Sequence, residues 1–437
     1  MSVMIGGQCT LQKNKVKEIT FLQKVFTALV LLMPALSVYA TIVPGFNLGE
    51  LFIILWMPVM LADMVRKRTR LRYSPFWMYL IYALFSTVVI TVFLLCFRTS
   101  FSPVKMVVRV IRDGMYFIII CLFGAEYFDY SYAKQFLTRL TYILGFYMYL
   151  QFAVYLLFGI YISGFIPFLP SALSGGLTFA GHSAHYLMSA SYDGYVRANG
   201  FYAEPAVCAQ CISIALLLTL FPSQGEGKVN YKRAAVFTAF MLPTFSVNAY
   251  IAIIVCWGLH IVYVIFSGKM QAIWIYAIIV LATIGIILFF LNDASRSVFM
   301  RLVNLFAAGQ VTGSSAVRVL RGPAFFMCMP LFYQIFGIGF GNFLSFRESY
   351  GITTVFEEPT EYMNTNAYIL TSSGIIGFVL FYTTLIAVVR SKITASKMLL
   401  CLLFVFSISS SLYSSPQFVA FMLFILYSPE MRSKNAD

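Results

Sequence analysis

Basic residues lie within an otherwise apolar stretch of the chain, "SPVKMVVRVIRDGMYF". Lys105, Arg109 and Arg112 are spaced by four and three residues, which places them on one face of a helix. Guanidinium groups bind phosphate oxygens through paired hydrogen bonds, so this face predicts a basic groove that takes a phosphate or diphosphate. The alternative is that the long side chains reach out to membrane headgroups. In either case, Asp113 is expected to pair with one of the arginines.

Polar residues also stand at the start of another apolar run, in "VRANGFYAEPAVCAQC" (196–211). Arg197 precedes the run and Glu204 begins it. Pro205 follows, a residue type that the first turn of a helix accepts. An acidic side chain at such a place complements the positive end of the helix dipole. The simplest interpretation is that Glu204 caps the helix and Arg197 reaches the headgroups, and the alternative is a role for both in binding or catalysis.

A third group of charges, Arg318 and Arg321, stands in "SSAVRVLRGPAFF". This pattern predicts a helix that begins after Ser314 and Ser315. The spacing of three places both arginines on one face of that helix. They are expected either to bind an anion or to belong to a solvated helix within a loop.

Few residues of the chain are arranged to hold a metal. His182 and His185 have an H-x-x-H spacing in "GHSAHY", but Asp193 is the one further ligand type near them. Cys208 and Cys211 form a C-x-x-C inside an apolar helix, with no second pair nearby, and are interpreted as buried thiols. The sequence therefore predicts neither a metal site nor a redox site.

The elements that carry these residues belong to a membrane protein. The chain has 437 residues, of which 11% are charged and 60% hydrophobic, and its mean hydropathy is +0.85. Soluble domains carry about 25% charged residues. Apolar runs of about 17–25 residues, each long enough to span a bilayer, recur along nearly the whole chain. We therefore predict an all-α polytopic protein that forms a single integral membrane domain, 1–437, without a soluble domain.

About twelve membrane spans are expected, and the basic residues orient them. The basic segments between spans, such as "RKRTRLR" and "KVNYKR", fall on one side, which the positive-inside rule makes cytoplasmic. The net charge of +14 is therefore attributed to topology and not to nucleic-acid binding. Both termini are expected inside, and the first apolar segment is interpreted as a retained helix and not as a cleaved signal peptide. The expected spans are 21–43, 48–65, 76–97, 104–125, 136–161, 203–221, 234–246, 249–267, 271–291, 367–389, 398–412 and 416–428.

This topology leaves two long segments on the outer side, 162–202 and 292–366. Loops much longer than about 12–15 residues are usually functional or disordered. These two are rich in Phe, Tyr and Gly and contain apolar pieces such as "FIPFLP" and "LFYQIFGIGF". We expect folded caps with short helices that lie at the membrane interface.

Three segments together resemble the bacterial O-antigen polymerases. They are "VRANGFYAEPAVCA", then "GSSAVRVLRGPAFFMCMPLFYQIFGIGFGNF" with its Arg-bearing helix and G-x-G-x-G, and "NTNAYILTSSGIIGFVLFY" with its Asn-x-Tyr-Leu entry into a late span. The resemblance covers roughly the second half of the chain and the hydropathy profile. It implies a GT-C-like membrane glycosyltransferase that works at the periplasmic face of the bacterial inner membrane.

The resemblance also implies substrates. Such an enzyme moves a growing glycan from undecaprenyl diphosphate onto the sugar end of the next lipid-linked repeat unit, and it needs no metal, nucleotide or other cofactor. The expected partners are undecaprenyl-diphosphate-linked oligosaccharide and membrane lipid, with a chain-length regulator protein as a further candidate and no nucleic acid.

Two alternatives to a polymerase remain. The related O-antigen ligases use lipid A core as acceptor and commonly carry a histidine just before the Asn-x-Tyr-Leu segment, where this chain has Thr365. That departure weakens the ligase interpretation and leaves the general base unassigned. A flippase or other transporter of lipid-linked sugars is the second alternative, because twelve spans and buried arginines fit one. The sequence shows no paired half-repeats with broken helices, which transporter folds often have.

The resemblance assigns expected roles to particular residues. Arg197, Arg318 and Arg321 are expected to hold the donor diphosphate, while Arg109 and Arg112 line the groove or hold a second diphosphate. If a base activates the acceptor hydroxyl, Glu204 comes first. If no strong base is used, the arginines that neutralise the leaving diphosphate supply much of the rate. The next candidates for the base are Glu357, Glu358 and Glu361. Asn366 is a further candidate for substrate binding. Tyr362 and Tyr368 are expected either to stack on sugars or to anchor the chain at the membrane interface.

Overall fold

The computed structural model of this chain is helical. It describes residues 19–39, 41, 46–69, 76–97, 103–160, 162, 197–223, 228–268, 314–352, 363–413 and 415–430, apart from the side chains of 103–105 and 314–318. Within these ranges there is no β-strand, and Lys392 and Glu430 form an isolated bridge. The expected all-α class is confirmed for this part of the chain.

The helices follow the apolar runs of the sequence. In the first half of the chain they are α1 (Phe21–Leu36), α2 (Leu48–Arg66), α3 (Phe76–Phe97), α4 (Pro103–Ile118), the π-helical turn η1 (Ile119–Phe123), α5 (Gly124–Tyr127) and α6 (Tyr130–Phe158). In the second half they are α9 (Pro205–Leu220), α10 (Tyr231–Met241), the 3₁₀ turn η5 (Leu242–Thr244), α11 (Val247–Phe266), α14 (Ser314–Cys328), α15 (Leu331–Phe336), α16 (Phe343–Tyr350), α17 (Thr365–Val389), α18 (Thr394–Ser409) and α19 (Pro416–Leu426).

Membrane character is clear from helix length and composition. Five of the described helices, α2, α3, α6, α11 and α17, are long and apolar enough to cross a membrane. The apolar helices α1, α9, α18 and α19 are shorter. The number of spans and their orientation stay predictions, and the expected span 271–291 lies outside the described residues.

Several helix bounds differ from the expected spans. The first helix ends at Leu36 and not at residue 43, and the Ser37 hydroxyl donates to the Pro34 carbonyl just beyond it, at 2.7 Å. The helix expected over 234–246 ends at Met241, because Pro243 lacks the N–H that would continue it. The expected span 104–125 is interrupted by η1, a widened turn that often occurs at functional sites.

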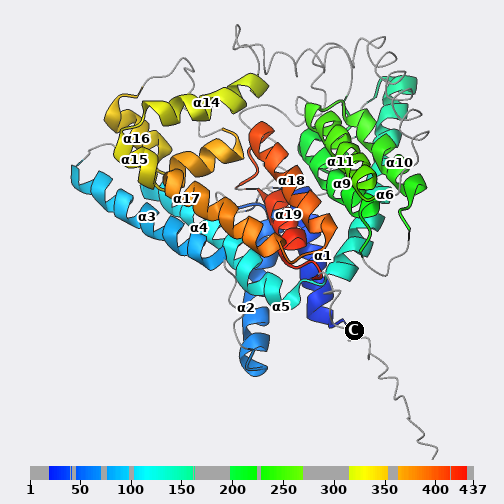
Figure 1. The fold of residues 1–437 in the computed structure, drawn as a ribbon, viewed down its shortest axis with the longest axis horizontal. Coiled ribbons are helices and arrows are strands. Elements are labelled where there is room, and N and C mark those ends of the chain that lie inside the picture. Colours follow the sequence, from blue (N-terminus) through cyan, green and yellow to red (C-terminus); the bar gives the residue numbers. More distant parts are fainter. Residues whose placement is uncertain are drawn as a thin grey trace, which may run out of the picture.

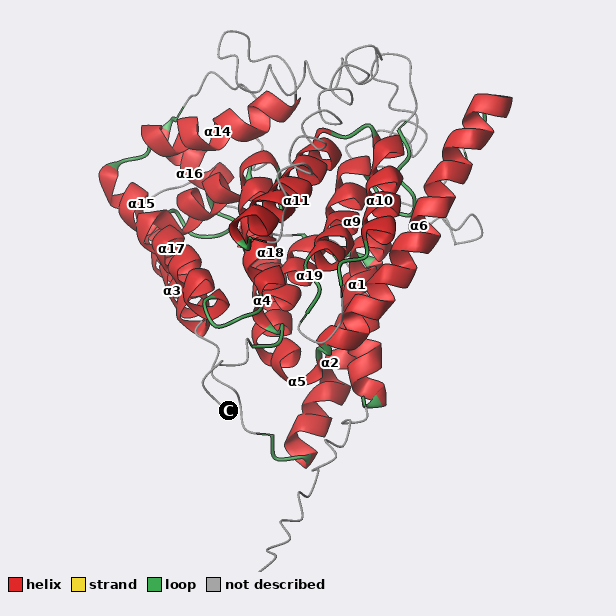
Figure 2. Cartoon of the chain, turned by 45° about the vertical axis from the view of Figure 1, so that its right-hand side comes forward, coloured by secondary structure: helices red, strands yellow, loops and turns green. Residues whose placement is uncertain are grey.

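The helices form two groups that α18 and α19 join (Figure 1). On one side lie α3, α4 and α14 to α17, and on the other lie α6 and α9 to α11. The helices α14, α15 and α16, which belong to the segment 292–366, lie together at one end of the bundle, opposite the end at which the described chain finishes (Figure 2). These short helices agree with the expectation of folded structure in that segment.

An aromatic cluster fills the interior between α3, α4 and α17. Tyr79 lies in this cluster with ring centroids 5.7 Å from Phe117 and 5.1 Å from Phe381, and its hydroxyl is 2.9 Å from the hydroxyl of Tyr413. Phe76 and Phe117 are stacked at 5.5 Å. Offset and edge-to-face ring contacts contribute about 0.5–1.5 kcal/mol each beyond burial. Because Phe117 of α4 belongs to this cluster, the cluster packs the end of α4 that follows its charged residues against α3.

A break in α17 lies at the centre of the first group. Gly374 has φ 68° and ψ −176° inside this helix, and its backbone approaches that of Gly337 so closely that a Cβ would lie 2.5 Å from the Gly337 nitrogen. The break releases carbonyl groups from the helical hydrogen-bond pattern. The Thr371 carbonyl accepts from the Ile338 N–H at 3.0 Å, and the Ser372 carbonyl accepts from the Gly339 N–H at 2.9 Å. The G-x-G-x-G loop is therefore bonded to α17 through the backbone.

Substituting Gly374 with alanine is expected to destabilise the protein strongly. The backbone conformation is one that only glycine adopts readily, and the new Cβ would stand 2.2 Å from the Ile335 carbonyl oxygen. Strain and overpacking together predict a loss of at least about 3 kcal/mol. Gly351→Ala is the matched control, because Gly351 also has a positive φ, of 59°, but its Cβ would have no neighbour within 4 Å. Thermal unfolding in detergent measures both, and equal losses would contradict the close-contact argument.

Candidate functional site

Arg109 is held at the junction of α4 and α17. Its Nε lies 3.7 Å from the Asp113 Oδ2 and donates to the Tyr368 hydroxyl at 3.0 Å. The guanidinium carbon also stands 5.0 Å from the centre of the Tyr368 ring, which is a cation–π distance. The expectation that Asp113 pairs with an arginine of the same helix is confirmed.

Arg112 has a different acidic partner, Glu50 of α2. The Glu50 side chain is fully buried, and its Oε1 lies 3.4 Å from the Arg112 Nε and accepts from the Tyr116 hydroxyl. Its Oε2 accepts from the Asn47 N–H at 2.8 Å, which completes a capping box at the start of α2. Glu50 was not among the site residues expected from the sequence. The sequence pattern that indicates its position is a capping box, in which Asn47 stands three residues before Glu50 at the start of an apolar run.

The two arginines of α4 form neutral pairs. Each arginine side chain is 23% exposed, whereas the side chains of Asp113 and Glu50 are 7% and 0% exposed. Both guanidinium groups therefore contact buried carboxylates through Nε, which favours an internal position over the alternative that they reach out to headgroups. Opposite charges in each pair cancel formally, and a compensated guanidinium attracts a phosphate less strongly than an isolated one.

Tyr368 differs from its expected role as a sugar-stacking ring. Its side chain is buried, with ring centroids 5.8 Å from Phe340 and 5.5 Å from Tyr413, and Phe340 and Tyr413 are themselves stacked at 5.4 Å. No face of the ring is open to a sugar, so the stacking role is corrected. Tyr368 positions Arg109 instead. The neighbouring candidate, Asn366, accepts a hydrogen bond from the hydroxyl of Tyr382, which also belongs to α17.

The G-x-G-x-G loop fixes α4 against α3. Gly337, Gly339 and Gly341 have φ of 85°, 79° and 77°. A Cβ on Gly341 would stand 2.9 Å from the Met106 Cα and 3.2 Å from the Arg109 Cβ, so the loop backbone lies directly on α4. The loop also contacts α3, where the Thr87 hydroxyl accepts from the Phe340 N–H at 3.0 Å. The loop thereby holds Arg109 in place from one side while Tyr368 holds it from the other.

The Arg-bearing helix α14 begins at Ser314, so that it includes the two serines that were expected to precede it, and packs across the start of α17. A Cβ on Gly322 would stand 2.2 Å from the Ala367 Cβ, and the Asn364 amide donates to the Val319 carbonyl at 3.2 Å. Arg321 is buried, with 5% of its surface exposed, and lies next to this contact in the sequence. Arg318 lies one helical turn earlier, and its side chain is outside the described part of the structure.

The segment that contains Arg197 is anchored in the second helix group. The Arg197 Nε donates to the Thr244 carbonyl at 3.4 Å, and the Ala198 N–H donates to the Pro243 carbonyl at 2.9 Å. On its other side, the Gly200 N–H donates to the buried Gln151 of α6 at 2.9 Å. These contacts position Arg197 beside the turn between α10 and α11. The structure thus assigns Arg197 and Arg109 to different helix groups, which α18 and α19 join (Figure 1).

Glu204 occupies the N-cap position of α9, and Pro205 is the first helical residue, as expected. The cap is incomplete, because the Glu204 side chain makes no capping hydrogen bond. Nearby, burial raises the pKa of the Tyr202 phenol well above its ordinary value, so this group stays neutral. The capping interpretation therefore explains why Glu204 stands at the start of α9, but it does not assign a hydrogen-bonding role to the Glu204 carboxylate.

Thr365, at the place where ligases commonly carry a histidine, is a structural residue. It is fully buried, and both its N–H and its hydroxyl donate to the Ser410 carbonyl, each at 2.9 Å. The Ser410 hydroxyl in turn accepts from Gln210 at 3.1 Å and from Asn248 at 2.8 Å. This network ties α17 and α18 to α9 and α11. This network could not be expected from the sequence, because isolated Ser, Thr, Asn and Gln residues form no pattern along the chain.

Replacing Tyr368 with phenylalanine is expected to destabilise the site without changing its packing. The variant removes one hydrogen bond to a charged donor, which costs about 1.5–3 kcal/mol of unfolding free energy. Tyr413→Phe is the control, because it removes a hydroxyl contact between two neutral groups, worth about 0.5–1.5 kcal/mol. Thermal unfolding of the purified variants in detergent compares the two losses. A loss at Tyr368 no greater than that at Tyr413 would show that the contact to Arg109 contributes little.

Other candidates lie outside the described residues: Tyr362, Glu357, Glu358, Glu361, His182 and His185. Cys208 and Cys211 are free thiols buried in α9, in agreement with their interpretation. The described part of the chain contains no group of three or more His, Cys, Asp or Glu residues that could hold a metal. No protein-family model matches the sequence, and no curated protein matches it.

Proposed function

We propose that this protein is a membrane glycosyltransferase of the O-antigen polymerase type. It joins undecaprenyl-diphosphate-linked oligosaccharide units at the periplasmic face of a bacterial inner membrane, with both chain termini in the cytoplasm. One observation carries the proposal. The start of α17, one of the stretches that carry the resemblance, contacts another of them at both its Arg-bearing helix α14 and its G-x-G-x-G loop, and Tyr368 of α17 and Gly341 of the loop both lie against Arg109.

The proposed reaction forms one glycosidic bond and breaks another. A hydroxyl oxygen of the acceptor sugar attacks the anomeric carbon of the donor glycan, and the bond from that carbon to the diphosphate oxygen breaks. Undecaprenyl diphosphate leaves with the electron pair, while the hydroxyl proton passes to a base or to water. Because a diphosphate is a good leaving group, neutralising its developing charge supplies a large part of the rate.

The arginines divide this work. Arg197, Arg318 and Arg321 bind the diphosphate of the donor. Arg109 and Arg112 are paired with buried carboxylates, so they position the α4–α17 junction and the loop upon it. Glu204 accepts the proton, a role that the missing capping hydrogen bond supports because its carboxylate oxygens are not used by the helix end.

Thr365 favours a polymerase over a ligase. Its hydroxyl donates to the Ser410 carbonyl and accepts from the Leu412 N–H at 2.6 Å, which leaves it no role as a base. A polymerase has no need of a histidine at that place if Glu204 takes the proton.

A transporter is the second candidate, and the break in α17 is the observation that favours it. Transporters often bind their substrates at discontinuous helices whose free carbonyls face a cavity. In this chain, however, the carbonyls of Thr371 and Ser372 at the break are bonded to the G-x-G-x-G loop. The break therefore serves to attach the loop, and the transporter remains the weaker proposal.

Purified protein supplied with lipid-linked repeat units tests the proposal. Without ATP or an ion gradient, a polymerase converts single units into a ladder of longer lipid-linked chains, which gel electrophoresis resolves. A strain that lacks the gene should carry single repeat units on its surface. Long chains that accumulate on undecaprenyl diphosphate in that strain would indicate a ligase, and units that stall on the cytoplasmic leaflet would indicate a flippase.

A further inference from the structure

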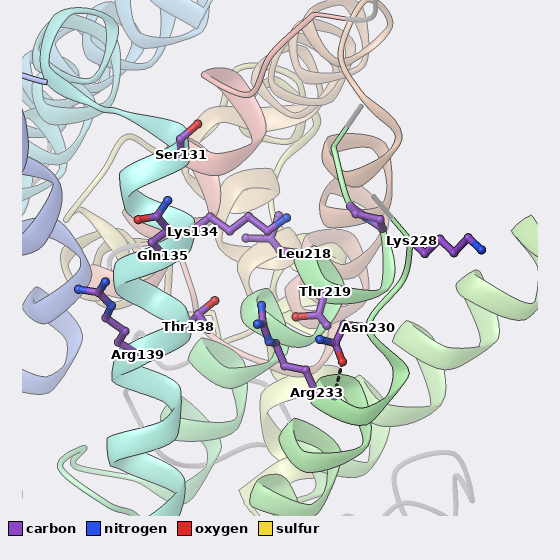
Figure 3. A pocket seen from close by; sticks show the side chains of 11 residues that line it. Ser131, Lys134, Gln135, Thr138, Arg139, Leu218, Thr219, Lys228, Asn230 and Arg233 are labelled. Atoms are coloured by element: carbon purple, nitrogen blue, oxygen red, sulfur yellow. Dashed lines mark hydrogen bonds between the residues drawn. The ribbon is translucent and has the colours of Figure 1, made fainter. Parts of the chain in front are cut away.

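A basic pocket lies far from the proposed reaction, between α6, the end of α9 and the start of α10 (Figure 3). Its volume is about 510 Å³, and its lining includes four cations, Lys134, Arg139, Lys228 and Arg233. In the described part of the chain, no Asp or Glu is among the lining residues. Four positive charges in the lining, with no carboxylate among the lining residues that the structure describes, favour an anionic ligand.

Two of these cations point into the pocket. Lys134 extends from α6 toward Leu218 and Thr219 of α9, and Arg233 rises beside Thr219 (Figure 3). The Nε of Arg233 is buried and, within the described part of the chain, has no hydrogen-bond partner. Buried donors in folded proteins nearly always have an acceptor, so this N–H is available to an acceptor that enters the pocket.

The backbone of α10 adds to the attraction. The pocket includes the first turn of this helix, where Asn230 caps the helix by accepting from the Arg233 N–H at 2.9 Å. The remaining N–H groups of a first helical turn and the positive end of the dipole favour a phosphate. The side chains and the backbone therefore both favour a negatively charged ligand such as a phosphate.

The outer surface of α6 indicates where the phosphate comes from. Arg139 is exposed at the rim of the pocket, and Ile143, Phe146 and Leu150 continue from it on the same helix face, with 59%, 65% and 50% of their surfaces exposed. A stripe of exposed apolar side chains on a helix long enough to cross a membrane is suited to contact acyl chains. Because Arg139 also lines the pocket, an acyl chain that lies along this stripe would bring its phosphate to the edge of the pocket.

We infer that this pocket binds the phosphate of an anionic phospholipid, with the headgroup between Lys134 and Arg233 and an acyl chain along the Arg139 face of α6. Basic pockets between membrane helices on the cytoplasmic side bind such headgroups in general. This inference does not depend on the proposed glycosyltransferase activity. Failure of either one leaves the other standing.

Native mass spectrometry of the detergent-solubilised full chain tests the inference. The probes are phosphatidylglycerol, phosphatidylcholine with the same acyl chains, and inorganic phosphate. We expect the protein to retain phosphatidylglycerol about tenfold better than phosphatidylcholine, and Lys134→Gln/Arg233→Gln to abolish this preference. The matched control, Arg66→Gln/Arg390→Gln, removes two cations outside the pocket and should leave the preference unchanged.

Three results would overturn the inference. Equal losses in the pocket and control variants would indicate general attraction between opposite charges. Binding of inorganic phosphate that displaces phosphatidylglycerol would identify a site for free phosphate. Absence of any preference in the unmodified protein would remove the site altogether. If the double variant does not fold, Arg139→Gln, at an exposed side chain, provides the measurement, and an unchanged preference in that variant would count against the lipid orientation.

Discussion

Replacing Arg197 with alanine is expected to abolish polymerisation while the protein still reaches the membrane at its normal level. The proposed role of this guanidinium is to neutralise charge that develops on the departing diphosphate. Removing one such preorganised donor lowers rates by about 100- to 1,000-fold. Arg318→Ala is expected to have the same effect. Rates of chain lengthening with purified protein measure the loss, and the ladder of surface glycans in cells provides the second readout.

Lysine at these two positions separates charge from geometry. Arg197→Lys and Arg318→Lys should recover part of the activity, because an ammonium restores the charge but cannot form the paired hydrogen bonds of a guanidinium. Arg347→Ala is the matched control. Its Nε also donates to a backbone carbonyl, that of Ile352 at 3.3 Å, but the residue has no proposed role in the reaction. Normal polymerisation by an Arg197→Ala or Arg318→Ala variant would remove that residue from the diphosphate site.

Glu50→Ala should be the most destabilising of the charge substitutions. The carboxylate is fully buried between Arg112 and Tyr116, and its loss leaves the guanidinium without its acidic partner. Breaking a buried ion pair by removing one side costs about 3–5 kcal/mol. The substitution also removes the capping box of α2. Thermal unfolding of the purified protein in detergent measures this loss, independently of any assay of activity.

An exposed ion pair provides the comparison for Glu50. Lys392 and Glu430 are 3.4 Å apart, but the Glu430 side chain is 72% exposed, so Glu430→Ala should cost about 0–1 kcal/mol. The double variant Glu50→Ala/Arg112→Ala should lose less than the sum of its two single variants, because it leaves no unpaired buried charge. If Glu50→Ala were no worse than Glu430→Ala, the pair with Arg112 would not stabilise the fold.

Local features of the site could be predicted from the sequence, because neighbours along a helix are fixed by its geometry. Asp113 was expected to pair with one of the arginines of its own helix, and the structure contains that pair with Arg109, four residues away. Pro205 predicted the first turn of α9, and the paired serines predicted the start of α14 to within two residues. Few charges and long apolar runs predicted a helical membrane protein, and five of the described helices are long and apolar enough to cross a membrane.

Contacts between distant segments were decided by the tertiary structure. Glu50 and Arg112 are far apart in the sequence, and no periodicity states which faces of α2 and α4 meet. Tyrosine is a residue type that is common at membrane interfaces, yet Tyr368 is buried by its packing against Phe340 and Tyr413. The break at Gly374 exists because the G-x-G-x-G loop supplies N–H groups to carbonyls that α17 releases. A helical pattern determines what lies on one face, while helix packing determines what that face touches.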